Sequence, residues 1–221
     1  MMVSMDIYDV MRTTGAVRVF TGDPLPDETL ARILDNARFA PSGGNRQGTR
    51  VVVIRDQATK EKLADLSATG SRRYIAQQRN GESPWNPLHP MGVSAEDLAA
   101  VRVPRATHLI EADVLLVVCV DLGVVAAFDQ DLDRISLVSG ASVYPLVWNI
   151  LLAARNEGFG GVLTTMVVSE EAAAKQLLGI PEQFAIAAAL PLGKPAKQLT
   201  KLKRKAVSEF VTRERFDGAA F

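Results

Sequence analysis

The stretch FAPSGGNRQGTR, residues 39–50, separates a helical pattern from a strand-like run. Before it, PDETLARILDNARFA (residues 26–40) repeats its apolar residues at the spacing of one helix face. After it, RVVVIRD (residues 50–56) is a short β-branched run. Proline, serine, asparagine and glycine gathered between two such patterns are typical of a turn. Local rules therefore predict a helix, a loop and a strand, and they leave open whether the loop only connects or also binds.

The whole chain has the composition of a globular protein. Its 221 residues are 48% hydrophobic, and 25 basic residues balance 25 acidic ones. This length suits one sizeable core, so we expect a single domain over residues 1–221. The charge balance gives no reason to expect a nucleic-acid partner. The N-terminus lacks the apolar core of a signal peptide, and no apolar stretch approaches the roughly 20 residues of a membrane span, so we expect a cytoplasmic protein without a membrane partner.

Helix-like and strand-like patterns alternate along the rest of the chain. Residues 58–67 are helical in pattern, and the pattern then breaks from Gly70 to about Pro104 into a stretch rich in proline and glycine. This lid-like segment, residues 70–104, carries Tyr74, Trp85 and Met91. The pattern further predicts a strand over 113–121, an all-round apolar and buried helix within 139–161 that GFGG stops, a strand over 161–168, a short helix capped by Ser169 and ending at Gly179, a last strand within 184–195, and a C-terminal extension over 195–221.

Few side chains suit metal or nucleophilic chemistry. The only histidines are His89 and His108, and neither stands at metal-ligand spacing from other ligand residues, so no metal is predicted. No serine has the Gly-x-Ser-x-Gly context of a nucleophile, and no Walker-type phosphate loop is present. Cys119 lies inside an apolar run, where a buried inert thiol is expected. By elimination, an enzyme built from these residues depends on a cofactor, and no catalytic side chain is predicted.

Several separated stretches, taken in order, resemble the FMN-dependent nitroreductase family. That family has an N-terminal basic-Ser-x-basic-x-Phe element, an Ala-Pro-Ser-x-x-Asn-x-Gln loop, an apolar central helix ending in a glycine turn, and a C-terminal basic residue. GVLTTMVVSEEAAAKQLLGIP, LPLGKP and LKRK are similar in particular to the branch that includes iodotyrosine deiodinases and many bacterial nitroreductases. The matching stretches are Thr14–Phe20, Ala40–Gln47, Ser139–Gly161, and Arg204 with Lys205.

This resemblance implies a fold and an assembly. The expected fold is α+β (a layered α/β arrangement) of the nitroreductase type, with a central, mainly antiparallel sheet flanked by helices. The expected assembly is an intertwined homodimer with FMN at the subunit interface. The apolar helix then serves the core on one side and the partner on the other, although a central helix of a monomer is also apolar all round. The residues expected to be shared in this way are Val143, Leu146, Val147, Ile150 and Leu151.

The resemblance also implies which residues bind FMN. Arg18 is expected beside the N1/C2 region, where a guanidinium stabilises the negative charge of the reduced flavin. Thr165 is expected near N5, and Arg204 at the phosphate. The full set comprises Thr14, Gly15, Ala16, Val17 and Arg18 at the phosphate and pyrimidine side; Pro41, Ser42, Gly43 and Asn45 on the partner's flavin; Leu163, Thr164 and Thr165 near N5; and Arg204 with Lys205 at the phosphate.

The chain departs from the family pattern at three places. Gly15 and Ala16 stand where a basic residue and a serine are common, which predicts weaker FMN binding unless Arg12 supplies the missing charge; Arg12 as a plain surface residue is an equal alternative. Gly48 and Thr49 stand where Pro-Trp often follows the loop. No lid residues for an amino-acid zwitterion are recognisable in residues 70–103, so the deiodinase substrate does not carry over.

The function implied by the resemblance is a two-stage reduction. NAD(P)H gives hydride to FMN and leaves, and a nitroaromatic, quinone or similar flat acceptor then takes its place, which predicts ping-pong kinetics. Tyr74, Trp85 and Met91 either cover the acceptor or only pack the loop down. The alternatives are another activity on the same flavin (reductive dehalogenation, enone reduction, oxidative flavin cleavage or deazaflavin-dependent reduction) and a flavin-binding protein without turnover. The sequence selects neither the acceptor nor NADH over NADPH.

Overall fold

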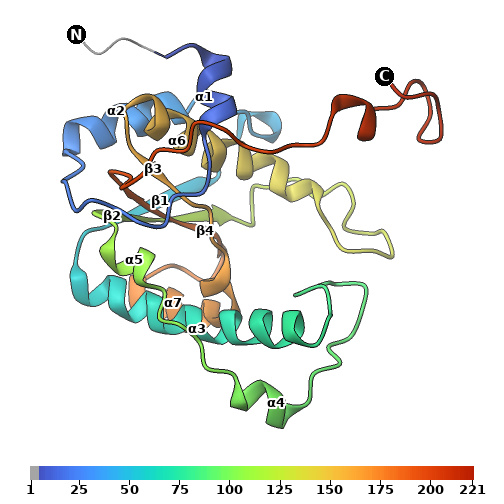
Figure 1. The fold of residues 1–221 in the computed structure, drawn as a ribbon, viewed down its shortest axis with the longest axis horizontal. Helices are drawn as coiled ribbons and strands as arrows, with labels where there is room; N and C mark the ends of the chain where they lie inside the picture. The colour runs from blue at the N-terminus through green and yellow to red at the C-terminus, as the bar shows by residue number, and fades with distance from the viewer. Residues whose placement is uncertain (1–4) are drawn as a thin grey trace.

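A four-stranded antiparallel sheet forms the centre of the molecule in the computed structural model, which describes residues 5–221 (Figure 1). The strand order is β1-β2-β4-β3, and every pairing is antiparallel. The predicted α+β fold with an antiparallel sheet is therefore confirmed. The strands are β1 (Thr49–Ile54), β2 (Val114–Asp121), β3 (Gly160–Gly161) and β4 (Phe184–Gly193).

Helices cover both faces of the sheet. Figure 1 shows α1, α2 and α6 on one face and α3, α5 and α7 on the other, while α4 lies beyond the end of α3. The α-helices are α1 (Ile7–Thr13), α2 (Asp27–Ala37), α3 (Gln57–Arg79), α4 (Ala95–Ala100), α5 (Thr107–Glu111), α6 (Tyr144–Asn156) and α7 (Glu171–Leu178). Short 3-10 turns are η1 (Gly43–Asn45), η2 (Val138–Ser142), η3 (Met166–Glu170) and η4 (Val207–Glu209).

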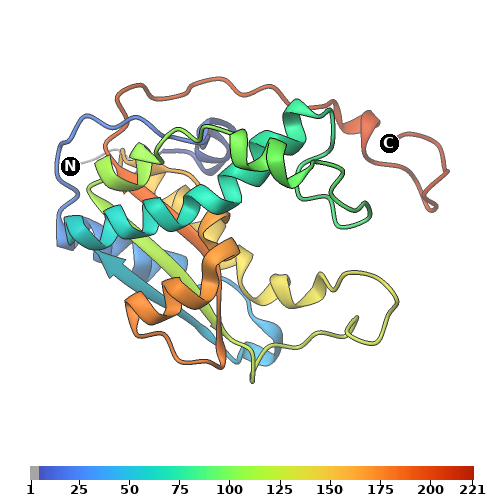
Figure 2. The same cartoon turned by 90° about the horizontal axis from the view of Figure 1, so that it is seen from below.

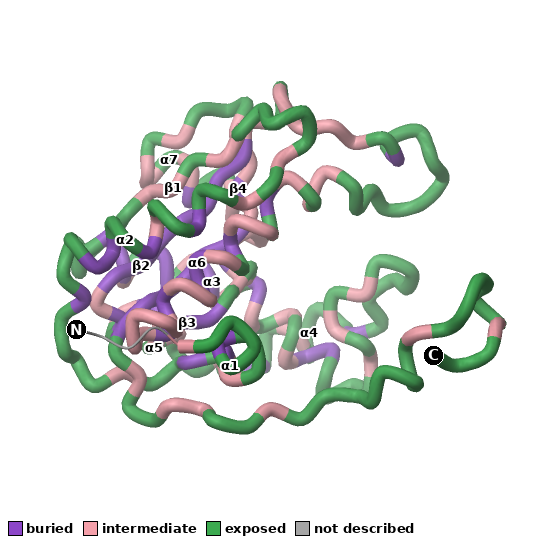
Figure 3. The backbone as a smooth tube through the Cα atoms, turned by 90° about the horizontal axis from the view of Figure 1, so that it is seen from above, coloured by how far each residue is buried: buried purple, intermediate pink, exposed green. Residues whose placement is uncertain are grey.

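Strand β2 explains why the sheet is sandwiched. Its residues from Val114 to Val120 are all buried, because β1 and β4 flank the strand and helices cover both of its faces. Leu116 and Val118 pack with α2 and α6, whereas Leu115 and Val117 pack with α3 and α7. Burying each such side chain contributes about 1.5–3 kcal/mol. Figure 3 shows this buried centre with exposed chain around it.

The sheet has two ends that matter for the site. At one end, where β1 begins, Thr49 pairs with Val120; we call this the loop end. At the other end, where β4 finishes, Gly160 pairs with Gly193; we call this the strap end. Val120 also pairs with Ala185 of β4, so the rise of about 3.3 Å per residue from Ala185 to Gly193 separates the two ends by about 26 Å.

Helix α3 is longer than the sequence pattern predicted. It runs without a break for 23 residues to Arg79, so the prediction of a loop from Gly70 is wrong for residues 70–79. A Cβ on Gly70 would lie 2.6 Å from the Met166 carbonyl oxygen and 2.9 Å from the Ser169 hydroxyl. The glycine therefore permits close packing of α3 on η3 rather than ending the helix. The predicted loop is also interrupted by α4, which Ser94 caps by accepting a hydrogen bond from the Asp97 amide.

The strand predicted over residues 161–168 is mostly absent from the structure. Only Gly160–Gly161 are in the strand, followed by a single bridge between Thr164 and Ala189. The chain then turns into η3, which buries Val167 against the α3 face of the sheet. The Ser169 hydroxyl donates to the Met166 carbonyl at 2.8 Å and does not cap α7, so that prediction is also wrong.

The ends of α6 and α7 agree with the glycine signals. Gly158 has a φ of +77° just after α6, and Gly179 has a φ of +65° just after α7, so both predicted stops are confirmed. All-round burial of α6 is wrong for a single chain. Ile150 is fully buried, whereas Tyr144 and Trp148 are 45% and 44% exposed, although the Tyr144 hydroxyl donates to the Ala187 carbonyl of β4 at 3.5 Å.

Candidate functional site

The N-terminal segment predicted to bind FMN lies at the strap end. The Thr14 hydroxyl is buried and donates to the Val10 carbonyl at 2.7 Å. The Val17 amide donates to the Gly161 carbonyl at 2.9 Å. A Cβ on Gly160 would lie 2.8 Å from the Val17 side chain, so only a glycine allows this approach. The structure thus places residues 14–18 directly against the glycine turn.

A C-terminal strap, residues 195–202, crosses the same segment. The Ala196 amide donates to the Val19 carbonyl at 3.0 Å, and the Gln198 side chain donates to the Thr13 carbonyl at 3.3 Å. A Cβ on Gly15 would lie 2.6 Å from a Leu199 methyl carbon, because the strap packs there. The departure from the family pattern at Gly15 therefore has a packing reason: a larger side chain would displace the strap.

Positive charge without carboxylate partners gathers at the strap end. Within residues 5–221, no ion pair involves Arg18, Lys194 or Arg204. Arg204 is exposed and follows Leu202, whose methyl carbon lies 3.1 Å from a Cβ built on Gly15. Two further residues of chain span at most about 7 Å, so the Arg204 backbone stays close to this segment. Such cations suit an anionic group.

The positive charge of Arg18 acts on His108 of α5. Burial lowers the pKa of His108 on α5, and the positive charge of Arg18 lowers it further, while Glu111 acts in the opposite direction. Arg18 itself is exposed. The guanidinium is therefore free to meet a ligand while standing next to a histidine that stays neutral at pH 7.

The predicted loop Pro41–Asn45 lies at the loop end. The Gly43 amide donates to the Ser142 hydroxyl at 3.0 Å, which ties the loop to η2. Asn45 and Gln47 have φ values of +53° and +50°, a region that non-glycine residues adopt rarely and at some cost. The loop borders a cavity of about 310 Å³ that also contacts Leu146 of α6. This exposed, strained loop is built to present groups outward.

One chain does not bring these two groups together. The segment 14–18 and the loop Pro41–Asn45 lie at opposite ends of the sheet, as Figure 2 shows, about 26 Å apart along β4. Arg204 and Lys205 lie on the strap side, in the exposed extension. A single ligand of ordinary size cannot contact both ends within one chain.

The third predicted group, Leu163 to Thr165, borders a separate cavity. Thr164 pairs with Ala189 midway along β4, and Leu163 is partly exposed. The cavity has a volume of about 390 Å³ and lies between α3 and η3. Of the three residues singled out in the lid-like segment, Tyr74 and Trp85 line this cavity and Met91 does not. The lining residues are Gly70, Tyr74, Pro84, Trp85, Thr165, Met166, Val168 and Ser169.

Two residues near this cavity were missed by sequence reasoning. Gly70 was treated as a helix stop, and Gln77 was assigned to a loop. Gln77 is 1% exposed and lies two helical turns beyond Gly70 on the same face of α3. Continuing the helical periodicity past Gly70 would have marked Gln77 as a polar residue on a buried face.

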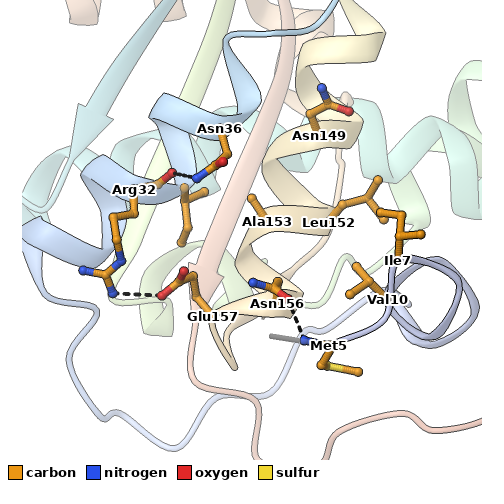
Figure 4. A pocket seen from close by; sticks show the side chains of 11 residues that line it. Met5, Ile7, Val10, Arg32, Asn36, Asn149, Leu152, Ala153, Asn156 and Glu157 are labelled. Atoms are coloured by element: carbon orange, nitrogen blue, oxygen red, sulfur yellow. Dashed lines mark hydrogen bonds and ion pairs between the residues drawn. The ribbon is translucent and has the colours of Figure 1, made fainter. Parts of the chain in front are cut away.

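A further groove lies between α1, α2 and α6, with a volume of about 360 Å³ (Figure 4). Arg32 and Glu157 form an ion pair at 2.8 Å at its rim. The Asn156 side chain accepts a hydrogen bond from the Met5 amide at 3.2 Å. None of the predicted FMN-binding residues lines this groove, so we do not include it in the candidate site.

Thiol and metal chemistry find no support in the described part of the chain. Cys119 is buried in β2, and burial raises the pKa of its thiol to about 11, so the reactive thiolate is scarce at neutral pH. Residues 5–221 contain no cluster of three or more histidine, cysteine, aspartate or glutamate side chains that could hold a metal ion. Over the same residues, no helix has the length and apolar character needed to cross a membrane.

Comparison with known proteins identifies the family. The model of the Nitroreductase family matches residues 11–194. The chain belongs to the nitroreductase family. This match covers the N-terminal segment, the loop, α6 and the glycine turn, and it stops just before the strap. The family resemblance drawn from the sequence is thereby confirmed.

Named relatives cover most of this nitroreductase-family chain. An NADH dehydrogenase of Thermus thermophilus is 29% identical over 201 residues, covering 83% of each chain. An iodotyrosine deiodinase of Hydra vulgaris is 25% identical over 210 residues, covering 94% of this chain and 72% of the relative. A crystal structure of an oxidized iodotyrosine deiodinase bound to FMN and 3-iodo-L-tyrosine superposes with a TM-score of 0.69 at 25% identity, covering 95% of this chain and 99% of the other.

Proposed function

We propose that this protein is an FMN-dependent oxidoreductase that works as a homodimer. It takes hydride from NAD(P)H and reduces flat electrophilic acceptors such as quinones or nitroaromatics in a ping-pong sequence. With a quinone, the overall reaction converts quinone, NAD(P)H and a proton into hydroquinone and NAD(P)⁺. With a nitroaromatic, the same two electrons and two hydrogens give a nitroso compound and water.

The observation that carries this proposal is the strap end of a nitroreductase-family chain. Two cations without carboxylate partners belong to the segments that meet here: Arg18 follows Val17, which packs on Gly160, and Arg204 follows the strap that packs on Gly15. These residues fit the anionic and planar parts of FMN. The related iodotyrosine deiodinase structure contains FMN, and the related Thermus protein is named an NADH dehydrogenase.

Each group of residues has a role in this proposal. Bound FMN would supply a ring position, N5, that accepts hydride and later donates it. Arg204 and Lys205 would hold the phosphate, and Arg18 would stabilise negative charge on the reduced ring. Thr165 would lie near N5 beside the cavity between α3 and η3. The loop Pro41–Asn45 would close over the flavin of the other subunit.

The exposed face of α6 supports the dimer. Tyr144 and Trp148 are spaced one turn apart and are nearly half exposed. The neighbouring loop also exposes Phe128 and Leu137. Large apolar side chains exposed together are typical of a protein interface. A second chain seated on this face would cover them, and it would provide the loop that one chain keeps about 26 Å from its own strap end.

Reductive dehalogenation is the alternative that a specific observation favours. Several relatives, including the Hydra protein, are named iodotyrosine deiodinases. That reaction would use the same flavin, so it shares every role given above except the acceptor. Release of iodide from 3-iodotyrosine by the reduced protein would favour it over the quinone or nitroaromatic acceptor.

The cofactor is tested by titrating the purified protein with FMN and measuring absorbance and flavin fluorescence. We expect stoichiometric binding, and we expect Arg204→Ala to weaken it at least about tenfold, equal to about 1.4 kcal/mol. Arg79→Ala, an exposed change at the end of α3, is the matched control and should bind as the parent does. No binding by the parent would overturn the proposal, and parent-like binding by Arg204→Ala would remove that residue from the site.

The reaction is tested under anaerobic conditions with the FMN-loaded protein. NADH or NADPH should bleach the flavin absorbance, and a quinone or nitroaromatic should restore it. A flavin that stays oxidised with both nicotinamides would exclude the reductase and leave a deazaflavin donor or a binding role. Parallel lines in double-reciprocal plots are expected for the ping-pong sequence, and intersecting lines would contradict it.

The dimer is tested by sedimentation velocity. The parent should sediment as a dimer, and Trp148→Glu should shift it toward a monomer because a charge then faces the interface. Leu88→Glu, at an exposed apolar position outside α6, is the control. A monomeric parent that still binds FMN tightly would show that one chain is sufficient.

A further inference from the structure

The cavity between α3 and η3 has an uncharged lining. Its walls are the apolar surfaces of Trp85, Pro84 and Met166, and its polar groups are hydroxyls, including those of Tyr74 and Thr165. No acidic, basic or histidine side chain lines it. A volume of about 390 Å³ lies at the small end of the range for ligand pockets. Such a cavity suits a small flat ring, and none of its lining side chains could form an ion pair with a charged group.

The wall formed by Trp85 is held in position from several directions. The indole Nε1 donates to the Gly70 carbonyl at 3.1 Å, and the guanidinium carbon of Arg73 lies 4.0 Å from the ring centre. The Trp85 backbone has a φ of +55°. A bulky residue rarely adopts this conformation, so the surroundings must hold it there.

Gln77 is the residue that holds this turn. Its side chain is 1% exposed, and its Oε1 accepts hydrogen bonds from the Trp85 amide at 2.9 Å and from Arg73 at 3.3 Å. Its Nε2 donates to Glu82 at 2.9 Å. The other Glu82 oxygen accepts from the Asn80 side chain and the Gly92 amide. One buried amide thus connects helix α3 to both sides of the turn that carries Trp85.

The segment beyond this turn also packs down. Val93 and Val101 are buried against Ala76 of α3, with Leu98 of α4 beside them. Hydrogen bonds and apolar contacts thus tie the segment predicted to act as a lid to α3, and its residues Pro84 and Trp85 form part of the cavity wall.

We propose that this cavity binds the electron acceptor as a flat, uncharged ring against Trp85, and that Gln77 is the positioning residue that keeps the indole in place. This inference rests on the proposed function only in calling the bound ring an electron acceptor. Binding of an uncharged ring at Trp85 is testable without turnover. It narrows the acceptor class to neutral quinones and nitroaromatics and disfavours amino-acid zwitterions and carboxylates.

Two single-tryptophan variants test the binding directly in protein without FMN. Trp148→Phe leaves only Trp85, and Trp85→Phe leaves only Trp148; the two indoles are 41% and 44% exposed. Nitrobenzene or menadione should quench Trp85 fluorescence with saturation, whereas Trp148 should show no saturable quenching, because it lies on α6 and does not line this cavity. Saturable quenching of Trp148, or none of Trp85, would overturn the proposal.

Charge selectivity is tested with matched probes. 4-Nitrobenzoate should bind at least tenfold more weakly than nitrobenzene in the same Trp85 titration, because the cavity has no cation for its carboxylate. Equal affinity would contradict an uncharged site. If the FMN-loaded protein reduces neither probe yet binds them with this selectivity, the proposed function fails and the cavity assignment stands.

The role of Gln77 is tested by Gln77→Glu, which keeps the accepting oxygen but places a carboxylate against Glu82. In dithionite-reduced, FMN-loaded protein, the apparent Kd for menadione should rise at least tenfold while the limiting rate of flavin reoxidation stays the same. Gln78→Glu, the exposed neighbour on α3, is the control and should behave as the parent does. A parent-like Kd for Gln77→Glu would overturn its positioning role.

A second variant covers the case in which Gln77→Glu does not fold. Trp85→Gly removes the ring at a position whose positive φ glycine adopts freely, so the turn should be retained. Its melting temperature should match the parent, and its Kd for menadione should rise at least tenfold. Unchanged affinity in this variant would show that Trp85 does not form the wall.

Discussion

The strap end and the loop end of the sheet are held together in different ways. At the strap end, backbone and side-chain hydrogen bonds join segments far apart in sequence, such as Val17 with Gly161 and Thr13 with Gln198. At the loop end, the loop Pro41–Asn45 is exposed and is fixed mainly by short-range bonds and by Ser142. Within one chain, the strap end is packed by its own long-range contacts. In the proposed dimer, the exposed loop end of each chain would complete the flavin site at the strap end of the other.

The sharpest test of this difference is a pair of glycine substitutions. A Cβ on Gly161 would overlap the Pro191 carbonyl oxygen and lie 2.6 Å from Leu192, whereas a Cβ on Gly43 would meet only the Ser142 hydroxyl, at 3.4 Å. We expect Gly161→Ala to lower the stability by about 3 kcal/mol and the melting temperature by roughly 6–12 °C. Gly43→Ala should stay within about 0.5 kcal/mol of the parent. Calorimetry of both variants measures this, and equal losses would show that the two ends are packed alike.

Asp129 is the exception at the loop end. It lies in the protruding loop between β2 and η2 and is 3% exposed. Its carboxylate accepts hydrogen bonds from the Leu137 and Val138 amides, the Ser136 hydroxyl and Arg134. These donors, the Leu137 amide above all, hold the pKa of Asp129 well below its usual range. One carboxylate therefore organises a loop that otherwise exposes apolar side chains.

Asp129→Asn should give an intermediate loss of stability, because one amide oxygen cannot replace a carboxylate that accepts from four groups. The folded carboxylate has a depressed pKa, so its contribution is present above the usual aspartate pKa near 4 and disappears as the pH falls toward the folded value. Melting curves between pH 7 and pH 3 should therefore show the parent and the variant converging in acid. Asp131→Asn in the same loop is the control, and a constant difference across this range would contradict the role of the charge.

His108 should give the smallest effect, at the strap end. Its folded pKa is lowered, mainly by burial and also by Arg18, so the unfolded chain binds more protons as the pH falls below about 6.5. Stability should therefore decrease between pH 7 and pH 5.5, and His108→Gln should reduce that slope. Arg18→Gln should reduce it only in part, because burial remains. Urea unfolding at the two pH values measures the change in stability with pH. A larger change in either variant than in the parent would contradict this assignment.

Local sequence patterns correctly predicted the helices and helix ends whose conformation depends on residues within the same element. The helix over residues 27–37 follows from apolar spacing, and the stops at Gly158 and Gly179 follow from the freedom of glycine at positive φ. Gly70 shows the limit of the same rule. Its role depends on η3, almost a hundred positions later in the chain, so a pattern read along the sequence took a packing glycine for a helix stop.

The candidate site was predictable in composition but not in arrangement. The family resemblance supplied Arg18, Asn45, Thr165 and Arg204, yet nothing in the sequence places the first two at opposite ends of the sheet. The strand register fixes that separation. Gln77 was missed because a buried amide on a helix has no sequence motif. Its structural role comes from contacts with Trp85 and Glu82 that form only in the folded chain.

The strap also sets an order of assembly. Gln198 reaches Thr13 across 185 positions of sequence, and contacts that close such long loops form late because the loop-closure entropy must be overcome first. A chain synthesised from its N-terminus can complete the sheet at Gly193 before the strap exists. Thr13 must therefore wait for Gln198 to emerge before this contact can form. Uptake of a ligand at the strap end would then follow the synthesis of the strap.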